Sequence, residues 1–130
     1  MTISRCFVNI CSDRLPATRD FYVDLLGFRI AYDSDWFVQL GDAESDATIG
    51  IIARDHELVP ESARGAFGGS YLTIVVADVE PVYARAKDLD VPIVEAPRDL
   101  FYGQRRMLVT DPNGYLVDVS SPTAPPPTDL

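Results

Sequence analysis

An internal repeat is the feature that most constrains the fold of this chain. The pattern of residues 3–53 predicts a strand, a helix and three further strands, and residues 71–119 repeat that order. Aligning Phe7-Val8-Asn9-Ile10 with Tyr71-Leu72-Thr73-Ile74 matches aromatic with aromatic and polar with polar residues. We therefore predict an α+β fold of two β-α-β-β-β modules that together form one structural domain.

Capping and turn residues set the expected boundaries. In the first module, residues 1–54, a helix begins near Leu15 and Gly27 ends it. In the second module, residues 70–121, Asp78 caps a helix that runs to about Leu89. The expected strands cover residues 3–11, 28–32, 36–40 and 48–53, then 71–76, 91–95, 107–110 and 115–119. Residues 55–69 are predicted to form a linker, and residues 122–130 a proline-rich flexible tail.

A predicted hairpin closes the second module. Asp111-Pro112-Asn113-Gly114 lies between two runs of β-forming residues, and Pro, Asn and Gly suit the backbone angles of a chain reversal. The hairpin and the residues just before it carry polar and charged side chains, namely Gln104, Arg105, Arg106 and Asp118. Such groups on the strands of a small, largely apolar domain are candidates to line a binding cavity.

Charge and hydropathy exclude some classes of function. The 130-residue chain has a net charge of -9, which opposes the phosphate backbone of nucleic acids. No apolar run approaches the roughly 20 residues that cross a bilayer, so neither a nucleic acid nor a membrane is an expected partner. A cytoplasmic location is expected. Cys6 and Cys11 should be reduced thiols, because their spacing on one strand points them to opposite faces.

Strand alternation divides the first strand of each module between two faces. Val8 and Ile10 share one face, and we expect them to pack under the helix together with Leu72, Ile74 and Val76. The opposite face carries a mixture of aromatic and polar residues, namely Phe7, Asn9, Cys11, Tyr71, Thr73 and Val75. That mixture is typical of a ligand cavity. The alternatives are an ordinary sheet surface or a dimer contact.

The motifs and their order resemble the vicinal oxygen chelate superfamily, to which glyoxalase I, extradiol dioxygenases, fosfomycin-resistance enzymes and bleomycin-resistance proteins belong. The similarity covers about residues 3–121 and rests on the paired modules and on short motifs at matching spacing. Those motifs are Phe21-Tyr22 before Leu26-Gly27, and Tyr102-Gly103-Gln104-Arg105 before Asp111-Pro112-Asn113-Gly114. The resemblance implies curled mixed sheets that form an open cavity, usually completed in a homodimer.

In the metalloenzymes that this chain resembles, four cavity positions hold His, Gln or Glu. The resemblance places these positions at Phe7 or Cys6, at Gly50 or Thr48, at Tyr71 and at Asp118. Only Asp118 is a clear ligand for a hard cation, and one carboxylate does not make a metal site. His56 falls in the linker, where a solvated side chain is expected. We therefore predict neither a metal nor another cofactor.

The remaining polar residues suggest a metal-free site. Asp118 beside Tyr71 and one of the two arginines is a candidate acid–base group, although a structural hydrogen bond or ion pair is an alternative role. Only one of Arg105 and Arg106 can face the cavity, where it would suit a carboxylate, a phosphate or a planar anion. Trp36, Phe37, Phe101 and Tyr102 are candidate aromatic walls.

Two hypotheses of different class follow. The first is a metal-independent protein that holds an aromatic or amphipathic small molecule in a sheet-lined cavity, with a homodimer as the expected assembly. The second is a lyase or isomerase that uses Asp118 as a base or in an atypical metal site. The predicted ligand-binding residues are Phe7, Asn9, Trp36, Tyr71, Thr73, Tyr102, Gln104, Arg105, Arg106 and Asp118.

Overall fold

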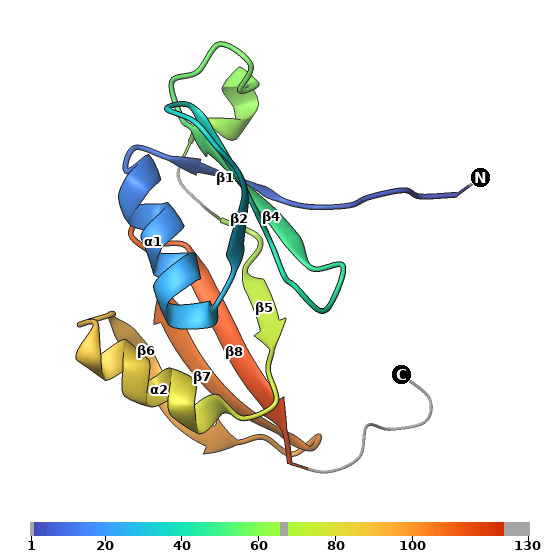
Figure 1. Cartoon of the computed structure of the whole chain (residues 1–130). Helices are drawn as coiled ribbons and strands as arrows, with labels where there is room; N and C mark the ends of the chain where they lie inside the picture. Colours follow the sequence, from blue (N-terminus) through green and yellow to red (C-terminus); the bar gives the residue numbers. More distant parts are fainter. Residues whose placement is uncertain (1, 66–67, 124–130) are drawn as a thin grey trace. The chain divides into compact units, whose positions relative to one another are not determined.

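The computed structural model describes residues 2–65 and 68–123. It separates into two compact units, residues 1–66 and residues 67–130, a division that falls inside the predicted connection between the modules. Each unit contains one β-α-β-β-β module, so the predicted α+β fold is confirmed (Figure 1).

The first unit is a mixed four-stranded sheet with one helix. Its strand order is β1-β4-β3-β2, with β1 parallel to β4 and the other pairs antiparallel. The elements are β1 (Asn9–Ser12), α1 (Leu15–Leu26), β2 (Arg29–Asp33), β3 (Phe37–Gly41), β4 (Thr48–Ala53) and a short 3-10 helix, η1 (Glu61–Ala63). The parallel pair β1 and β4 requires a crossover, and the connection between them contains α1, β2 and β3.

The second unit repeats this topology with the strand order β5-β8-β7-β6. Its elements are β5 (Leu72–Val75), α2 (Val79–Asp88), β6 (Ile93–Asp99), β7 (Gln104–Thr110) and β8 (Leu116–Pro122). The registers of the two parallel pairs correspond under the alignment of the repeats, because Asn9 lies opposite Gly50 and Thr73 lies opposite Asp118.

The helices begin differently but bury equivalent faces. Asp78 caps α2 by accepting a hydrogen bond from the N–H of Glu80 at 3.0 Å, as predicted. Arg14 holds the same place before α1 and makes no side-chain cap. Gly27 ends α1 in the left-handed conformation, with φ of 77°, where glycine meets no Cβ penalty.

Each helix packs on one face of its own sheet and forms a core there. The buried apolar residues of the first unit include Ile10, Tyr22, Leu25, Leu40 and Ile51. Those of the second unit include Val79, Val82, Met107, Val109 and Val119. The face of each sheet away from its helix carries Asn9, Thr73, Gln104, Arg106 and Asp118, whereas Arg105 lies on the helix side.

Several predicted strand ends were wrong. The strand expected at residues 91–95 spans Ile93–Asp99, and the one expected at residues 107–110 spans Gln104–Thr110. The first strand begins at Asn9 instead of residue 3, because its register with β4 would place Phe7 opposite Thr48, and residues before Phe7 run past the start of β4. Val8 is consequently 48% exposed and does not pack under the helix. The last strand continues to Pro122, while residues 124–130 of the predicted tail lie outside the described residues.

No helix among the described residues is long and apolar enough to span a bilayer.

Candidate functional site

The face of the second sheet that lies away from α2 is the candidate site, and we call it the open face. Strand alternation and register assign to it Thr73, Val75, Gln104, Arg106, Leu108, Asp118 and Ser120. Burial agrees with this assignment, since Met107 and Val109 on the helix side are fully buried, whereas Thr73 and Val75 are exposed. Strand β6 adds Glu95 and Arg98, which lie opposite Leu108 and Arg106, so the face combines two carboxylates, two guanidinium groups and the apolar side chains of Val75 and Leu108.

Asp118 lies at the centre of the open face and is 5% exposed. Two hydroxyl groups donate to its carboxylate: Thr73 Oγ1 to Oδ2 at 3.1 Å and Ser120 Oγ to Oδ1 at 2.5 Å. Thr73 comes from the adjacent strand β5, directly opposite Asp118, and Ser120 is two residues further along β8. The arrangement keeps a buried carboxylate hydrogen-bonded on both oxygens, as burial of a charge requires.

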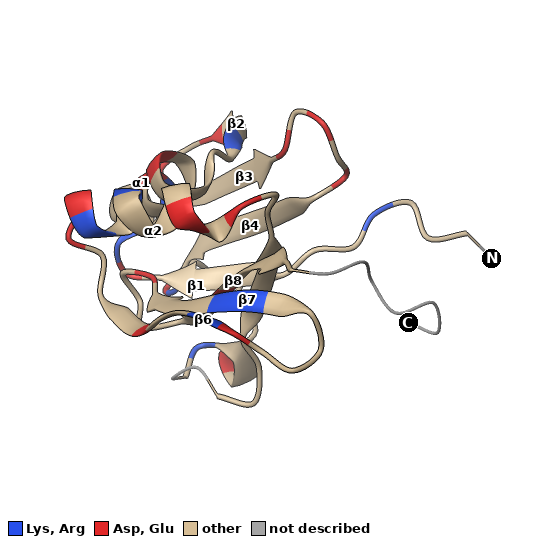
Figure 2. Ribbon diagram, turned by 90° about the horizontal axis from the view of Figure 1, so that it is seen from below, with Lys and Arg blue, Asp and Glu red and all other residues tan. Residues whose placement is uncertain are grey.

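Figure 2 shows basic residues on β7, and strand alternation places its two adjacent arginines on opposite faces of the sheet. Arg105 pairs with Glu80 of α2 at 2.6 Å and with Asp99 at 3.0 Å. Its hydrogen bonds to Glu80 and Asp99 raise its pKa above the ordinary arginine value. Arg106 lies opposite Ser120 and therefore occupies the open face. Arg105, included among the predicted ligand-binding residues, is thus held on the helix side.

Arg106 is less completely paired than Arg105. Its Nη2 contacts Glu95 at 3.4 Å, and its buried Nε has no hydrogen-bond partner within the described part of the chain. Glu95 is held more closely by Arg98, at 2.7 Å, and the Arg98 hydrogen bond is the main reason that the pKa of Glu95 lies below its usual value.

A second unpaired polar atom lies two residues away on β7. Gln104 Oε1 is buried and accepts no hydrogen bond from any described residue. A buried polar group without a partner costs about 1–3 kcal/mol, so such groups are usually satisfied by water or by a ligand. Gln104 Oε1 and Arg106 Nε therefore mark one end of the open face as a place where a polar ligand group would be stabilised.

The corresponding position in the first sheet is occupied by glycine. A Cβ on Gly50 would lie 2.2 Å from Asn9 Oδ1 and 3.1 Å from a ring carbon of Phe37. The side chains of its two neighbours therefore fill the space that a residue-50 side chain would need. No carboxylate can take the place in β4 that Asp118 takes in β8 unless Asn9 or Phe37 moves.

The first unit also contains a cavity of about 590 Å³ between the segment before β1 and the β3–β4 hairpin. Its polar lining includes Arg5, Gln39 and Thr48, with Asp42 and Asp46 from the hairpin loop. Gln39 Nε2 donates to Thr48 Oγ1 at 2.6 Å, and Arg5 Nη2 donates to Gln39 Oε1 at 3.4 Å. The volume lies within the range of small-molecule sites.

The predicted aromatic walls lie elsewhere. Trp36 stacks on His56 with ring centroids 4.3 Å apart, so His56 has a structural partner and is half-buried instead of solvated. Phe101 and Tyr102 pack edge to face at the turn between β6 and β7, where Phe101 is completely exposed. Phe7 precedes β1, and the Arg5 guanidinium lies over its ring at 4.9 Å. Phe37 does lie on the helix-free side of its sheet, beside Gly50.

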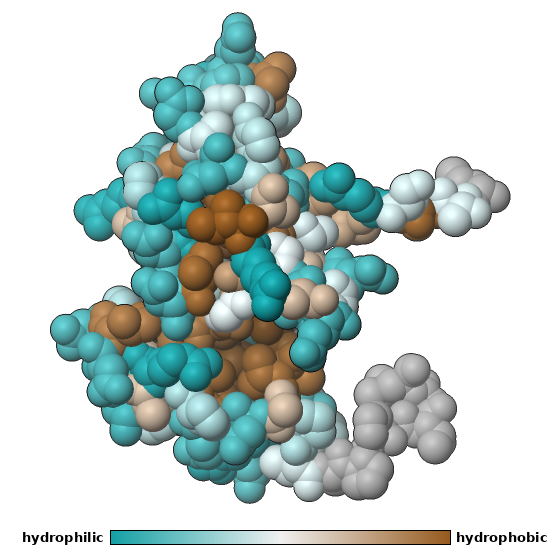
Figure 3. Space-filling view, viewed as in Figure 1, coloured by the Kyte–Doolittle hydropathy of each residue, from teal (hydrophilic) through white to brown (hydrophobic). Residues whose placement is uncertain are grey.

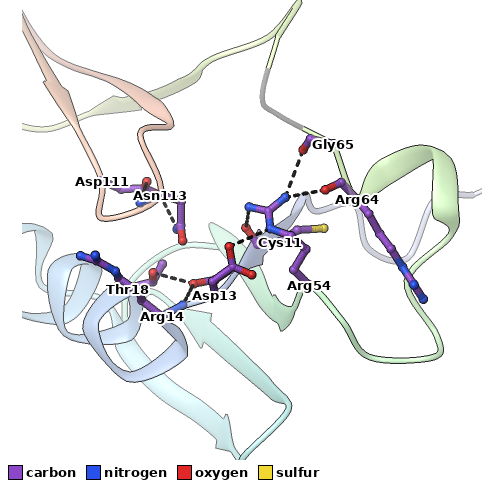
Figure 4. A network of polar contacts seen from close by, with 10 residues as sticks. Cys11, Asp13, Arg14, Thr18, Arg54, Arg64, Gly65, Asp111 and Asn113 are labelled. Carbon is purple, nitrogen blue, oxygen red and sulfur yellow. Dashed lines mark hydrogen bonds and ion pairs between the residues drawn. The ribbon is translucent and has the colours of Figure 1, made fainter.

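Arg54 organises the segment after β4 (Figure 4). Its guanidinium donates to the carbonyl oxygens of Cys11 at 3.1 Å, Arg64 at 2.9 Å and Gly65 at 3.0 Å, and it pairs with Asp13 at 3.3 Å. This role of Arg54 was not predictable from the sequence, because any residue can supply a backbone carbonyl acceptor.

Ser120 was also missed, although its signal was available. It lies two residues after Asp118 and one residue beyond the predicted strand, and in β8 strand alternation places both side chains on one face. Extending the expected strand by a single residue would have brought the serine into the candidate site.

The residues do not fit the metal site that the resemblance implies. Gly50 has no side chain, and the hydroxyl of Thr48, the alternative at that position, is occupied by Gln39 and by the Leu40 carbonyl oxygen. Both Asp118 oxygens accept from hydroxyl groups. Across the described residues, no group of three or more His, Cys, Asp or Glu side chains is arranged to hold a metal ion.

Comparison with known proteins places this architecture in a family. Residues 4–119 match the model of the Glyoxalase/Bleomycin resistance protein/Dioxygenase superfamily. No curated protein sequence matches the chain. Many solved structures share its fold, and three of them, at 19% to 21% identity, show the likeness of the fold alone.

The first of these is a member of that superfamily from Sphaerobacter thermophilus, with a TM-score of 0.75 and 19% identity over 92% of this chain and 98% of its own. An enzyme of the same family from Burkholderia phytofirmans has a TM-score of 0.75 and 21% identity, and the match covers 88% of this chain and 95% of its own. Lactoylglutathione lyase from Agrobacterium tumefaciens has a TM-score of 0.69 and 19% identity, and the match covers 93% of this chain and 96% of its own. With its paired modules and a family match over nearly its whole length, the chain belongs to the Glyoxalase/Bleomycin resistance protein/Dioxygenase superfamily.

Proposed function

We propose that this protein binds a small organic molecule on the open face of its second sheet, without a metal ion. The observation that carries the proposal is the donor set around Asp118, whose two oxygens accept hydrogen bonds from Thr73 and Ser120. Hydroxyl donors stabilise a carboxylate in the absence of a cation. Apolar surface at Leu108 and Val75 beside these polar groups has the composition of a ligand site.

The same geometry favours binding over catalysis. A general base must reach a substrate proton, whereas Asp118 is nearly buried and both of its oxygens are already engaged. The alternative, a lyase or isomerase that uses Asp118 as base, requires a substrate to reach a carboxylate that is 5% exposed.

Binding and chemistry can be separated in one experiment. Amide chemical shifts of the ¹⁵N-labelled protein are followed during addition of aromatic and amphipathic fragments in the presence of EDTA. Shifts centred on Thr73, Asp118 and Ser120 support the proposal, and binding that appears only after a divalent metal is added contradicts it. Conversion of a bound fragment during prolonged incubation would instead favour the enzyme.

We also propose that the protein is a cytoplasmic homodimer. Strand β2 lies at the edge of the first sheet, and its residues are exposed along their whole length, with Ile30 48% and Tyr32 52% exposed. An exposed edge strand with apolar side chains is suited to pairing with another chain. Light scattering after size-exclusion chromatography gives the mass directly, and a monomer at micromolar concentration would contradict the dimer.

A further inference from the structure

We infer that the ligand of the open face is an aromatic carboxylate whose carboxylate group binds Arg106. The inference rests on the proposed function and specifies the chemical class of the ligand. It follows from the unequal pairing of two adjacent arginines and from the residues that share a row with Arg106 across the sheet.

The first step concerns which cation is available. Arg105 is saturated by two carboxylates, at 2.6 Å and 3.0 Å, on the helix side of the sheet. Arg106 has one ion pair within the described residues, a 3.4 Å contact from Nη2 to Glu95. Glu95 itself is held by Arg98 at 2.7 Å, so it keeps a partner when Arg106 changes its own.

The second step concerns geometry. Arginine binds a carboxylate most specifically through two parallel N–H groups on one edge of the guanidinium. The edge that Arg106 offers consists of Nε, which has no partner in the described structure, and Nη2, whose contact with Glu95 is long. Arg106 Nε is buried, so the arginine side chain must move when a ligand binds. The contact that breaks is the 3.4 Å ion pair between Arg106 Nη2 and Glu95.

The third step concerns the rest of the ligand. Arg106, Ser120 and Val75 form one row across β7, β8 and β5, and Leu108 lies in the next row opposite Asp118. Val75 is 59% exposed, and Leu108 is partly exposed. Figure 3 shows hydrophobic surface over the part of the second unit where β5 and β8 lie in the same view of Figure 1. A flat apolar body would cover these residues while its anionic group remains at Arg106.

The position of Asp118 limits where the anion can lie. Its buried carboxylate would repel a second one, and its two hydroxyl donors are already used. The carboxylate of the ligand must therefore lie away from Asp118, at the guanidinium of Arg106, where it takes the place of Glu95 at Nη2. Leu108 and Val75 are then left for the ring.

The test compares cinnamate with its neutral isostere cinnamamide by isothermal titration calorimetry. The wild-type protein should bind cinnamate about tenfold or more tightly than cinnamamide, as expected for a charge-assisted pair. R106Q should remove that preference, lowering cinnamate affinity about tenfold while leaving cinnamamide within about twofold. R105Q is the matched control, because it removes the same charge one residue away on the other face, and it should preserve the preference.

The outcomes separate the two proposals. Equal affinity for both compounds, with amide shifts at Ser120 and Leu108, overturns the carboxylate inference but supports small-molecule binding at this face. Cinnamate shifts confined to Arg5, Gln39 and Thr48 would place binding in the cavity of the first unit and overturn the inference. Failure of both compounds to bind at millimolar concentration contradicts the inference and counts against the proposed function. Loss of the preference in R105Q, with the melting temperature unchanged, also overturns the role of Arg106.

Discussion

The two modules share a backbone plan but place different chemistry at equivalent positions. In the second module Thr73 lies opposite Asp118, and the hydroxyl binds the carboxylate. In the first module Asn9 lies opposite Gly50, and the asparagine side chain occupies the space that a Cβ on the glycine would need. The same strand register therefore holds a buried carboxylate, Asp118, in the second sheet. In the first sheet it places the Asn9 side chain against the backbone of Gly50. Topology positions these residues without determining what they do.

The largest expected effect is on stability, at Asp118. Asp118→Ala removes the acceptor of two hydrogen bonds inside a buried cluster, and we expect a loss of about 2–3 kcal/mol in the free energy of unfolding. Asp118→Asn keeps one oxygen and should cost about half as much. Asn9→Ala, at the equivalent of Thr73, should change stability by less than about 0.5 kcal/mol, because Asn9 is exposed. Urea denaturation of the three variants measures these differences, and equal losses at both sites would erase the contrast between modules.

The next effect concerns the crowded glycine of the first module. Gly50→Ala places a Cβ against Asn9 and Phe37, and we expect a loss of about 1–2 kcal/mol from overpacking. The double variant Asn9→Ala, Gly50→Ala removes the closer contact and should recover more than half of that loss. Thermal denaturation distinguishes the two contacts. A double variant as unstable as Gly50→Ala would show that Phe37, and not Asn9, sets the limit.

A smaller effect distinguishes the two helices. Asp78→Ala removes the N-cap of α2 and should cost about 1 kcal/mol. Arg14→Asp supplies the missing cap of α1, together with a negative charge near the helix N-terminus, and should stabilise the protein by up to about 1 kcal/mol. Chemical denaturation should therefore give changes of opposite sign. Two destabilised variants would mean that the backbone at Arg14, with ψ of 65°, does not accept a capping side chain.

The smallest effect is a shift in titration. The Glu95 carboxylate should titrate below the ordinary glutamate pKa of about 4.3, mainly because Arg98 donates to it. A lowered folded-state pKa means that its contribution to stability is complete above the unfolded pKa and is lost as pH falls through the folded value. Arg98→Gln should raise the pKa of Glu95 more than Arg106→Gln does, since the Arg98 contact is the shorter one. Side-chain carbon NMR reports both shifts, and the reverse order would contradict the pairing described for Arg106.

Much of the architecture was predictable, because both modules carry clear periodic signals. Leu15 and Gly27 mark the bounds of α1, and Asp78 caps α2, since helix ends depend on local backbone chemistry. The start of β1 was not predictable from its own sequence. Residues 3–6 were expected to continue the strand, but a strand needs a neighbour, and the register places these residues before the start of β4.

The sequence predicts which sheet face carries the candidate site, but it does not predict which groups pair with its arginines. Alternation along β5 and β8 is enough to bring Thr73 and Asp118 together once their register is known. The choice between Arg105 and Arg106 depends on α2, because Glu80 holds Arg105 on the helix side. The role of Arg54 depends on carbonyl oxygens far along the chain, which carry no residue-specific signal.

The Asn9 side chain fills the space beside Gly50, and this also restricts which substitutions the chain can accept during evolution. A single replacement of Gly50 by an acidic residue would drive its side chain into Asn9 Oδ1, so the first step toward a coordinating residue in this strand is penalised. Truncating Asn9 beforehand opens the path, because that residue is exposed and tolerant of change. The order of the two substitutions, more than their number, decides whether descendants of this sequence can acquire such a residue in the first module.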